Sequence, residues 1–290
     1  MENYIISAPH VDAGLSNRIK CLLTTLDANR LLKRKVLLRW EANFSCGARF
    51  NDLFDNDFPE ADSAQIKSKD NIIIDTWKLP YDCDFKFNEI PFETRNIILR
   101  YLNSLHIKKD IIEKVDIFLK SKIQPQMTVV GIHARRNEFL LNKDKSTSTD
   151  DLFFKRMDEL IEKDSNTYFF LATDSKKTEQ KFINKYQERI IVYSKSDLDR
   201  NNPETIKEAL AELLILSRFK YILGTYLSTY TEMAWWFGGA QAKIEIIGNK
   251  TSPLVTSEVN STSKLSLANQ WLRRNSSIFR KIMRIIGYWG

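Results

Sequence analysis

The feature that most constrains the fold is a repeated alternation of short β-branched runs with helical patterns. The first apolar run, residues 4–6, precedes apolar residues at helical spacing over 17–32, and further strand-like runs follow at 36–38 and 72–74. Alternation on this scale is typical of α/β proteins with mostly parallel sheets. A length of 290 residues is sufficient for two domains of ordinary size.

The alternation is interrupted at Gln124-Pro125-Gln126 and then begins again. Two successive runs predict two Rossmann-like domains, over residues 1–125 and 126–250, followed by a loose segment and a basic helix over 251–290. Ligands of such sheets bind beyond the carboxyl ends of the strands, so we expect functional residues at the strand-to-helix junctions. The remaining expected elements are helices over 94–105, 110–119, 151–161, 176–186, 203–217 and 229–237, and strands over 128–132, 168–172, 190–193, 221–223 and 244–247.

Positive charge is concentrated at the C-terminal end. The chain carries a net charge of +7, and residues 260–290 contain six basic and no acidic side chains, so the remaining chain is close to neutral. This distribution favours a local anionic partner and argues against a nucleic-acid-binding body. Residues 278–286 form a basic amphipathic pattern, which predicts either a helix on an anionic membrane surface or a terminal helix packed on the domains.

The sequence contains neither a recognisable targeting signal nor a membrane-spanning segment. The first ten residues include an acidic residue and only a short apolar run, and no stretch of about eighteen apolar residues exists. The cysteines Cys21, Cys46 and Cys83 are widely spaced and form no metal-binding motif. We therefore expect a protein of the reducing cytoplasm, either free or peripheral on the inner face of the membrane.

The junction after residues 128–132 is the most informative. This strand pattern continues directly into His133-Ala134-Arg135-Arg136. Two adjacent arginines at the end of a buried strand cannot be buried without a partner, because desolvating a charge is costly. Guanidinium groups match the oxygens of a phosphate, so we predict that this pair binds an anion. The alternative is a solvated pair, or an ion pair with Glu138 or Asp174.

Two further junctions place polar residues before helices. Gly14 permits a tight turn, and the helix after it has an N-terminus suited to an anion or a polar ligand. The alternative there is a glycine turn with Ser16 or Asn17 as the helix cap. Asp174 follows the strand at 168–172, where it can hold a ribose, a base or an arginine, or cap the next helix.

The last junction combines a carboxylate with a hydroxyl-rich turn. Glu212 lies within an otherwise apolar helix stripe, which indicates a carboxylate paired with an arginine or a hydroxyl, or else a surface residue. Thr225, Ser228 and Thr229 lie between a strand and a helix, where hydroxyls and backbone N–H groups suit a phosphate. Capping of the helix by Ser228 or Thr229 is the alternative.

Taken in order, these segments resemble motifs of the fucosyltransferase-like glycosyltransferases, the superfamily of the α1,2-, α1,6- and protein O-fucosyltransferases. The resemblance is to a bacterial-type member and spans about residues 3–240. It implies a GT-B fold, with two Rossmann-like domains and parallel sheets facing a central cleft. The matching segments are Gly14-Leu15-Ser16-Asn17-Arg18, Cys46-Gly47-Ala48-Arg49-Phe50-Asn51-Asp52-Leu53-Phe54, His133-Ala134-Arg135-Arg136, Leu171-Ala172-Thr173-Asp174, and residues 212–217 with 224–239.

The resemblance also implies a reaction. It is the inverting transfer of a sugar, fucose from GDP-fucose, onto a glycan hydroxyl in surface polysaccharide or lipid-linked oligosaccharide synthesis, with no metal and no cofactor besides the co-substrate. Arg135 would neutralise the leaving β-phosphate, and Arg136 would bind the same diphosphate. The base that activates the acceptor would be Glu138 or Asp12.

The other site residues carried over from the resemblance are divided between the nucleotide sugar and the acceptor side. They are His133 on the nucleotide or supporting the arginines, Asp174 on the nucleoside, Glu212 on the guanine or a backbone donor, Thr225, Ser228 and Thr229 along the phosphate and sugar, and Gly14, Asn17 and Arg18 facing the sugar from the first domain.

Two other functions are compatible with the sequence. One is a metal-dependent GT-A transferase with a different nucleotide sugar, since Asp-x-Asp pairs occur at residues 55–57, 82–84 and 197–199. The other is a non-catalytic protein that binds a nucleotide or a glycan. The transferase without a metal is the function that we predict.

Overall fold

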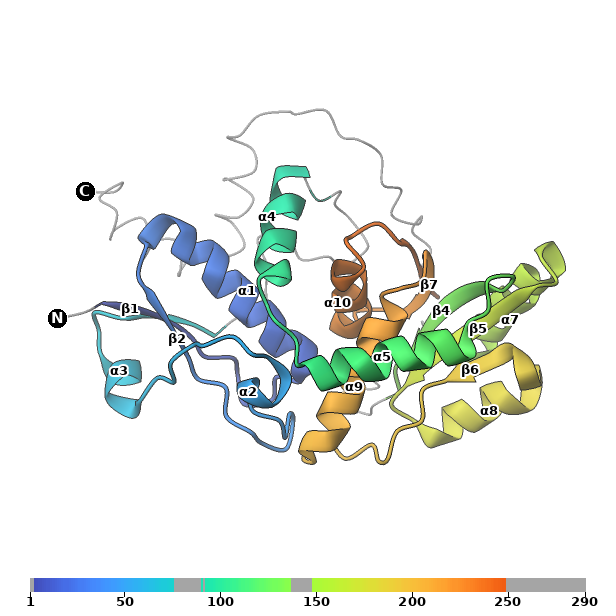
Figure 1. The fold of residues 1–290 in the computed structure, drawn as a ribbon, viewed down its shortest axis with the longest axis horizontal. Coiled ribbons are helices and arrows are strands. Elements are labelled where there is room, and N and C mark those ends of the chain that lie inside the picture. The colour runs from blue at the N-terminus through green and yellow to red at the C-terminus, as the bar shows by residue number, and fades with distance from the viewer. Residues whose placement is uncertain (1–2, 76–89, 91, 137–147, 249–290) are drawn as a thin grey trace.

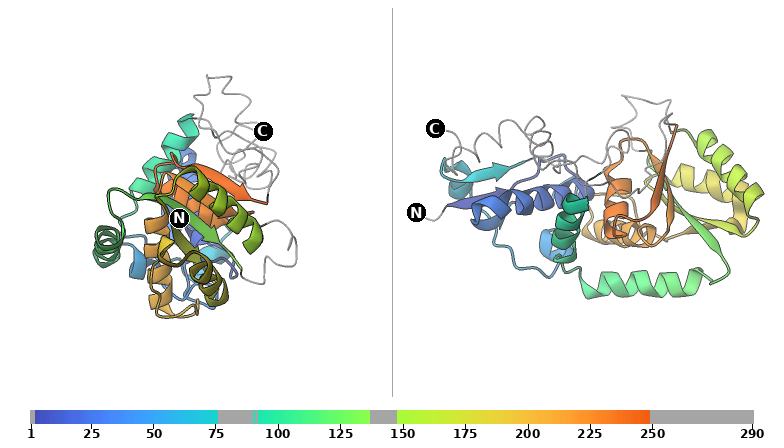
Figure 2. Two further views of the ribbon diagram at one scale, coloured as in Figure 1. Left: turned by 90° about the vertical axis from the view of Figure 1, so that its right-hand side faces the viewer. Right: turned by 90° about the horizontal axis from the view of Figure 1, so that it is seen from above.

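The predicted alternation forms two separate parallel sheets in a computed structural model, which describes residues 3–75, 90, 92–136 and 148–248 (Figure 1). The sheets lie toward opposite ends of the long axis of the molecule (Figures 1 and 2). The strands are β1 (Tyr4–Ser7), β2 (Lys35–Leu38), β3 (Ile72–Ile74), β4 (Thr128–Ala134), β5 (Thr167–Thr173), β6 (Ile190–Val192), β7 (Tyr221–Thr225) and β8 (Lys243–Ile247).

The helices agree closely with the expected spans. Residues 176–186 and 229–237 are helical over the predicted ranges, and the others differ from the predicted ranges by one to three residues at their ends. Two short helices were not predicted, because four or five residues are too few to show helical periodicity. The helices are α1 (Leu15–Leu32), α2 (Phe50–Leu53), α3 (Ser63–Lys67), α4 (Phe92–Asn103), α5 (Lys109–Lys122), α7 (Asp150–Lys163), α8 (Lys176–Tyr186), α9 (Pro203–Leu216) and α10 (Thr229–Phe237).

The N-terminal sheet has three strands in the order β2-β1-β3, all parallel. Ile5, Ile72 and Ile74 pack against Cys21 and Ala28 of α1, which therefore covers one face. The helix contacts this sheet through its middle and last turns, whereas Leu15 in its first turn belongs to the large cluster described below.

The C-terminal sheet has five parallel strands in the order β6-β5-β4-β7-β8, with helices on both faces. Side chains alternate between the faces along β5, as strand geometry requires. Phe169 and Leu171 pack in a cluster with residues of α7 and α8, whereas Phe170 and Ala172 belong to the cluster that contains α5 and α9. Strands β4 and β7 are neighbours in this sheet. The end of β4, which is followed by the two arginines, therefore lies next to the end of β7, which carries the hydroxyl of Thr225.

Helix α5 covers the C-terminal sheet although it precedes the break at residue 125. It packs along α9, and the ring of Phe118 meets the rings of Phe170 and Tyr193 edge-on at 5.8 and 5.4 Å. The last element before the break is thus spatially part of the second sheet's covering layer.

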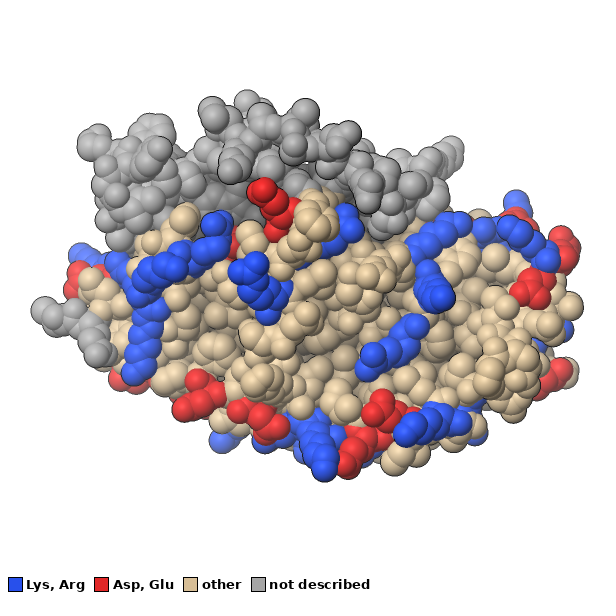
Figure 3. Space-filling model, turned by 45° about the horizontal axis from the view of Figure 1, so that its top comes forward, with Lys and Arg blue, Asp and Glu red and all other residues tan. Residues whose placement is uncertain are grey.

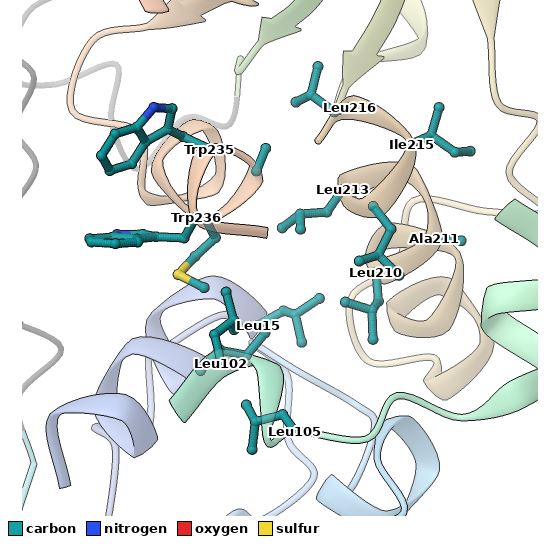
Figure 4. Close-up of a cluster of buried hydrophobic side chains, with 14 of the residues drawn as sticks. Leu15, Leu102, Leu105, Leu210, Ala211, Leu213, Ile215, Leu216, Trp235 and Trp236 are labelled. Carbon is teal, nitrogen blue, oxygen red and sulfur yellow. The ribbon is translucent and has the colours of Figure 1, made fainter. Parts of the chain in front are cut away.

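A single apolar core joins the two sheets (Figure 4). Leu15 of α1 and Leu102 of α4 lie with Leu210 of α9 and with Trp235 and Trp236 of α10 in one buried cluster. Because residues from both halves of the chain share this cluster, the two sheets form one packed body.

The segment 46–54 has a structural role in the first half. It contains α2, whose N-terminal residue is held by a hydrogen bond from Arg49 N to Asp52 Oδ2 at 2.7 Å. Phe50 stacks on Phe54 at 4.9 Å and meets Trp40 edge-on at 5.5 Å. This aromatic cluster fixes the loop that follows β2 at the carboxyl end of the N-terminal sheet.

Backbone contacts also join the halves. Gly47 N donates a hydrogen bond to the carbonyl of Arg200 at 2.7 Å. A Cβ atom at Gly47 would lie 2.1 Å from the carbonyl oxygen of Asn201, so only glycine permits this approach. The loops after β2 and β6 therefore meet, and the carboxyl ends of the two sheets face a common region.

A buried ion pair crosses the same boundary. Lys20 of α1 lies 2.8 Å from Glu232 of α10, and the two side chains are 1% and 5% exposed. Trp236 Nε1 also donates to Glu232, at 3.4 Å. Two charges this deeply buried depend on each other, because neither is solvated by water.

Within the described ranges no helix is long and apolar enough to span a membrane. On the face drawn in Figure 3, Lys and Arg side chains lie in separate patches among uncharged surface. The predicted basic helix over 278–286 and Cys83 lie outside the described residues.

The buried ion pair leads to a prediction about stability. Replacing Lys20 by Met should lower the free energy of unfolding by about 3–5 kcal/mol, because Glu232 is left buried without its cation. Denaturant unfolding followed by circular dichroism measures this loss. The double variant Lys20→Met/Glu232→Met should recover most of it.

The matched control is Lys207→Met, which breaks the less buried pair of Lys207 with Glu204 at 2.7 Å, whose side chains are 23% and 57% exposed. It should cost less than about 1 kcal/mol. Equal losses in the Lys20 and Lys207 variants would contradict the importance of the buried pair.

Candidate functional site

The end of β4 is held by hydrogen bonds from the neighbouring strand. Thr225 Oγ1 donates to the carbonyl of His133 at 2.9 Å and accepts from Arg135 N at 3.0 Å. On the other side Thr173 Oγ1 donates to the carbonyl of Ala134 at 2.6 Å. The backbone at Arg135 is therefore held by hydrogen bonds from both neighbouring strands, from Thr225 of β7 and from Thr173 of β5.

Arg135 has a guanidinium group with no hydrogen-bond or ion-pair partner in the part of the chain that the structure describes. Its Nε is buried and unpaired. Burial lowers the pKa of Arg135, the positive charge of Arg200 lowers it further, and Asp174 opposes the shift. A cation in this state gains from any anion that reaches it.

Arg136 differs from its neighbour because its guanidinium is engaged. Nε and Nη2 donate to Asp150 Oδ1 at 2.9 and 2.7 Å, and Nη1 donates to the carbonyl of Arg135 at 2.8 Å. The group also lies over the ring of Phe153, 5.5 Å from its centroid. The ion pair considered from the sequence is therefore present for Arg136, but its partner is Asp150. Diphosphate binding by Arg136 stays a prediction.

Asp174 joins the end of β4 to the loop after β6. Its Oδ1 accepts from Arg136 N at 2.6 Å, and its Oδ2 lies 3.3 Å from Arg200 Nη2. The cap of α8 is Ser175, which accepts from Thr178 N at 3.2 Å. The capping alternative for Asp174 is thus wrong, and the carboxylate is available to the arginines.

His133 is buried two residues before Arg135 and contacts side chains at the start of α10. Its Nδ1 is 2.8 Å from Thr231 Oγ1 and 3.2 Å from Ser228 Oγ, and its ring packs on Tyr230 at 4.6 Å between centroids. Burial, followed by the charge of Arg135, lowers the pKa of His133 well below its ordinary value, so the imidazole is neutral. Ser228 is the first residue before α10, but its hydroxyl contacts His133 instead of capping the helix.

Glu212 is buried and not a surface residue. Its Oε1 accepts from Lys195 Nζ at 2.5 Å, and its Oε2 accepts from Tyr230 OH at 3.2 Å. Lys195 also donates to the carbonyl of Thr173 at 2.7 Å. Burial raises the pKa of Glu212 while the charge of Lys195 opposes the rise. The Glu212 carboxylate therefore accepts a hydrogen bond from Tyr230 and is linked through Lys195 to the end of β5.

The first turn of α1 belongs to the other half of the site. Gly14 is the residue before this helix, and no side chain caps it, so capping by Ser16 or Asn17 does not occur. Ser16 Oγ and Asn17 Oδ1 are buried, and no residue of the described ranges forms a hydrogen bond with either atom. Arg18 is 2% exposed, and its guanidinium is fully used by the loops around it.

Arg18 ties together the loops at the carboxyl end of the N-terminal sheet. Its Nε, Nη1 and Nη2 donate to the carbonyls of Ala13 and Glu41 and to Asn43 Oδ1 at 2.8, 2.5 and 2.8 Å. Asn43 in turn donates to the carbonyl of Val11 at 3.0 Å. This side chain holds together the loops at the carboxyl end of the N-terminal sheet, while a contact of Arg18 with the sugar stays a prediction.

The candidate bases and the remaining hydroxyl are less defined. Asp12 is exposed, with Oδ2 3.3 Å from His10 Nδ1. Glu138 lies outside the described residues. Thr229 is the first residue of α10 and is half-buried beside Ser228.

The structure adds residues that the sequence analysis did not single out. Lys195 and Arg200 follow β6, so the rule that placed functional residues beyond strand ends applied to them as well. Their partners could not be named, because the contacts join segments far apart in the sequence. The residues added are Asp150, Lys195, Arg200, Tyr230 and Thr231.

Within the described ranges no group of three or more His, Cys, Asp or Glu side chains is placed to hold a metal ion. Asp55 is paired with Lys108 at 2.5 Å. The Asp pair at 82–84 lies outside the described residues. Independence from metal stays a prediction, which the requirement for a divalent ion tests.

Comparison with known proteins bears on the fold. No protein-family model and no curated protein matches the sequence. Among solved structures, NodZ α-1,6-fucosyltransferase from Bradyrhizobium, soaked with GDP-fucose, matches 84% of this chain and 94% of its own at a TM-score of 0.56 and 14% identity. POFUT1 in complex with GDP matches 86% and 99% at 0.57 and 11% identity.

A FUT1 mutant from Arabidopsis thaliana in complex with GDP matches 85% of this chain and 70% of its own, at a TM-score of 0.56 and 13% identity. Each of the three matches covers at least 84% of this chain. The predicted α/β fold of the GT-B type, as in fucosyltransferases, is therefore confirmed.

The buried imidazole leads to a prediction about acid stability. The folded state holds His133 neutral, whereas in the unfolded chain histidine binds a proton below a pKa of about 6.5. The unfolded state therefore binds more protons below that pH, and the free energy of unfolding falls as the pH falls. The contribution of His133 should be lost by up to about 1.4 kcal/mol per pH unit.

Unfolding by urea between pH 7.5 and 5 measures this dependence in the wild type and in His133→Asn, whose amide keeps a hydrogen-bonding group near the Nδ1 position. The variant should lose less stability on acidification than the wild type. His106→Gln, at an exposed position, is the control. The same pH dependence in all three proteins would contradict a neutral His133.

Proposed function

We propose that this chain is a glycosyltransferase of the fucosyltransferase type, which transfers fucose from GDP-fucose to a glycan hydroxyl with inversion and without a metal. The observation that carries the proposal is the guanidinium of Arg135. It lies at the carboxyl end of β4 on a backbone fixed by Thr225, and within the described ranges it has no anionic partner of its own. Strand ends of this kind are where nucleotide-binding sheets hold their ligands.

The chemistry of glycosyl transfer needs such a group. As the bond between sugar and phosphate breaks, negative charge grows on the departing diphosphate. A preorganised guanidinium stabilises that charge without having to reorganise during the step. The N-terminus of α10, next to the turn that contains Thr225, contributes backbone N–H groups of the same polarity.

The neutral state of His133 supports the same function. An imidazolium beside Arg135 would repel it, whereas the neutral ring packs on Tyr230 and leaves the guanidinium as the positive charge at the strand end. The named neighbours of similar fold were crystallised with GDP-fucose or GDP, which supports the choice of nucleotide.

The acceptor belongs to the side of the first turn of α1. The oxygens of Ser16 and Asn17 that lack a partner among the described residues lie in this turn, next to the loops that Arg18 holds in place. A glycan presents hydroxyls that such oxygens can accept hydrogen bonds from. The basic pattern at 278–286 supports an acceptor carried by a lipid at an anionic membrane surface.

Replacing Arg135 by Ala tests the central role. Transfer of fucose from GDP-fucose should fall by about 100- to 1000-fold, because the diphosphate loses its charge-stabilising donor. The melting temperature should stay close to that of the wild type, since the Arg135 side chain makes no hydrogen bond in the described structure. Near-normal turnover in this variant would refute the proposed role.

A donor and metal screen tests the substrate and the alternatives. Calorimetry with GDP, UDP and dTDP should show preferential binding of GDP, and transfer should survive EDTA. Loss of transfer in EDTA with recovery on adding a divalent ion would support the metal-dependent alternative. Binding of GDP with no turnover of any donor would identify a non-catalytic nucleotide-binding protein.

A further inference from the structure

Arg200 lies at the meeting point of the two halves, in the loop between β6 and α9. Its carbonyl accepts from Gly47 N at 2.7 Å, and Gly47 packs directly on Asn201. Asn201 N donates to Asp199 Oδ1 at 2.9 Å, which tightens the turn. The backbone of Arg200 is thus fixed by the N-terminal half, while its side chain extends toward the C-terminal sheet.

The guanidinium of Arg200 is held loosely. Its described contact is between Nη2 and Asp174 Oδ2 at 3.3 Å, and 36% of the side chain is exposed. The other oxygen of Asp174 accepts from the backbone N–H of Arg136, directly after Arg135. Asp174 therefore brings the charge of Arg200 to the strand end that carries Arg135.

The positively charged side chains around the end of β4 differ in how far carboxylates neutralise them. Arg136 and Lys181 share Asp150, and Lys195 is paired with Glu212. Among the described residues Arg200 contacts the carboxylate of Asp174, and Arg135 has no carboxylate partner of its own. Burial lowers the pKa of Arg135, and the positive charge of Arg200 adds to that shift. Two guanidiniums in each other's field leave a surplus of positive charge, which an anion between them would neutralise.

We propose that Arg200 is the second guanidinium of the diphosphate site and binds the pyrophosphate of the nucleotide together with Arg135. Arg136 is the positioning residue that holds the end of β4 through Asp150. The inference rests on the proposed function, and it assigns to a loop outside the motifs a direct contact with the substrate. Because Gly47 holds the backbone of Arg200, the occupied site would be supported from both halves of the chain.

Calorimetry with GDP and with guanosine tests this assignment in the full chain. Arg200→Gln should weaken the binding of GDP by about 10- to 100-fold, the loss expected for a hydrogen bond to a charged group. The binding of guanosine, which lacks phosphates, should not change. Arg200→Lys should recover part of the affinity, because it keeps the charge and loses the fork of donors.

The matched control is Arg30→Gln, which removes a similar single contact, from Arg30 to Asp27 at 3.4 Å, in the last turn of α1. It should bind GDP as the wild type does. Arg200→Met provides a second neutral variant if Arg200→Gln does not fold, and the melting temperature of each variant is compared with that of the wild type.

Three outcomes would overturn the inference. If Arg200→Gln binds GDP normally while Arg135→Ala does not, the proposed function stands and Arg200 has no part in it. If GDP and guanosine binding weaken equally, Arg200 acts on the shape of the site and not on the phosphates. If the wild type binds no GDP, the proposed function fails together with this assignment.

Discussion

Removing a positive charge from water is energetically costly, and this cost explains how the buried Lys and Arg side chains of this protein are paired. Lys20, Lys195 and Arg18 are almost fully buried, and each is matched to carboxylates or carbonyl oxygens within hydrogen-bonding distance. Arg136 is matched in the same way by Asp150. Among the described residues, the Nε atoms of Arg135 and Arg95 are both buried without a hydrogen bond, but only Arg135 lies at the end of a strand, whereas Arg95 lies in α4. The position of an unpaired guanidinium at the carboxyl end of β4 therefore marks the candidate site.

The two halves of the chain act as one body because polar and apolar contacts coincide at their boundary. The apolar cluster around Trp236 lies beside the ion pair of Lys20 and Glu232, and the loops at Gly47 and Arg200 meet close by. The ion pair of Lys20 with Glu232 constrains the relative position of α1 and α10 by its direction, whereas apolar contacts are not directional. The carboxyl ends of the two sheets are therefore held in a fixed relative position, and the proposed function depends on such fixed geometry.

The fold was predictable from the sequence because its signals are local. A short β-branched run and a helical spacing of apolar residues are each read within one segment, so β4, β5 and α10 could be located without knowledge of their neighbours. The position of Arg135 at a strand end followed in the same way. The sequence did not predict that Arg136 is paired while Arg135 is not. This difference depends on Asp150, which lies fourteen residues further along the chain than Arg136.

The same limit applies to Glu212 and His133. The sequence shows a carboxylate among leucines and a histidine after a strand, but Lys195 and Tyr230 come from other elements, and only the folded arrangement brings them together. Short segments such as α2 and α3 were missed for a different reason, since one helical turn shows no periodicity. Local patterns thus located the site, whereas the division of labour within it depended on pairings over long sequence distances.

The junction at Gly47 has a consequence for how such a sequence can change over time. The contact with Arg200 and Asn201 is made by main-chain atoms, so apart from the glycine it demands no particular side chain on either loop. Other residues of the two loops can therefore be substituted without loss of this main-chain contact. Any larger residue at position 47 would instead collide with the carbonyl groups of Arg200 and Asn201 and force the two loops apart.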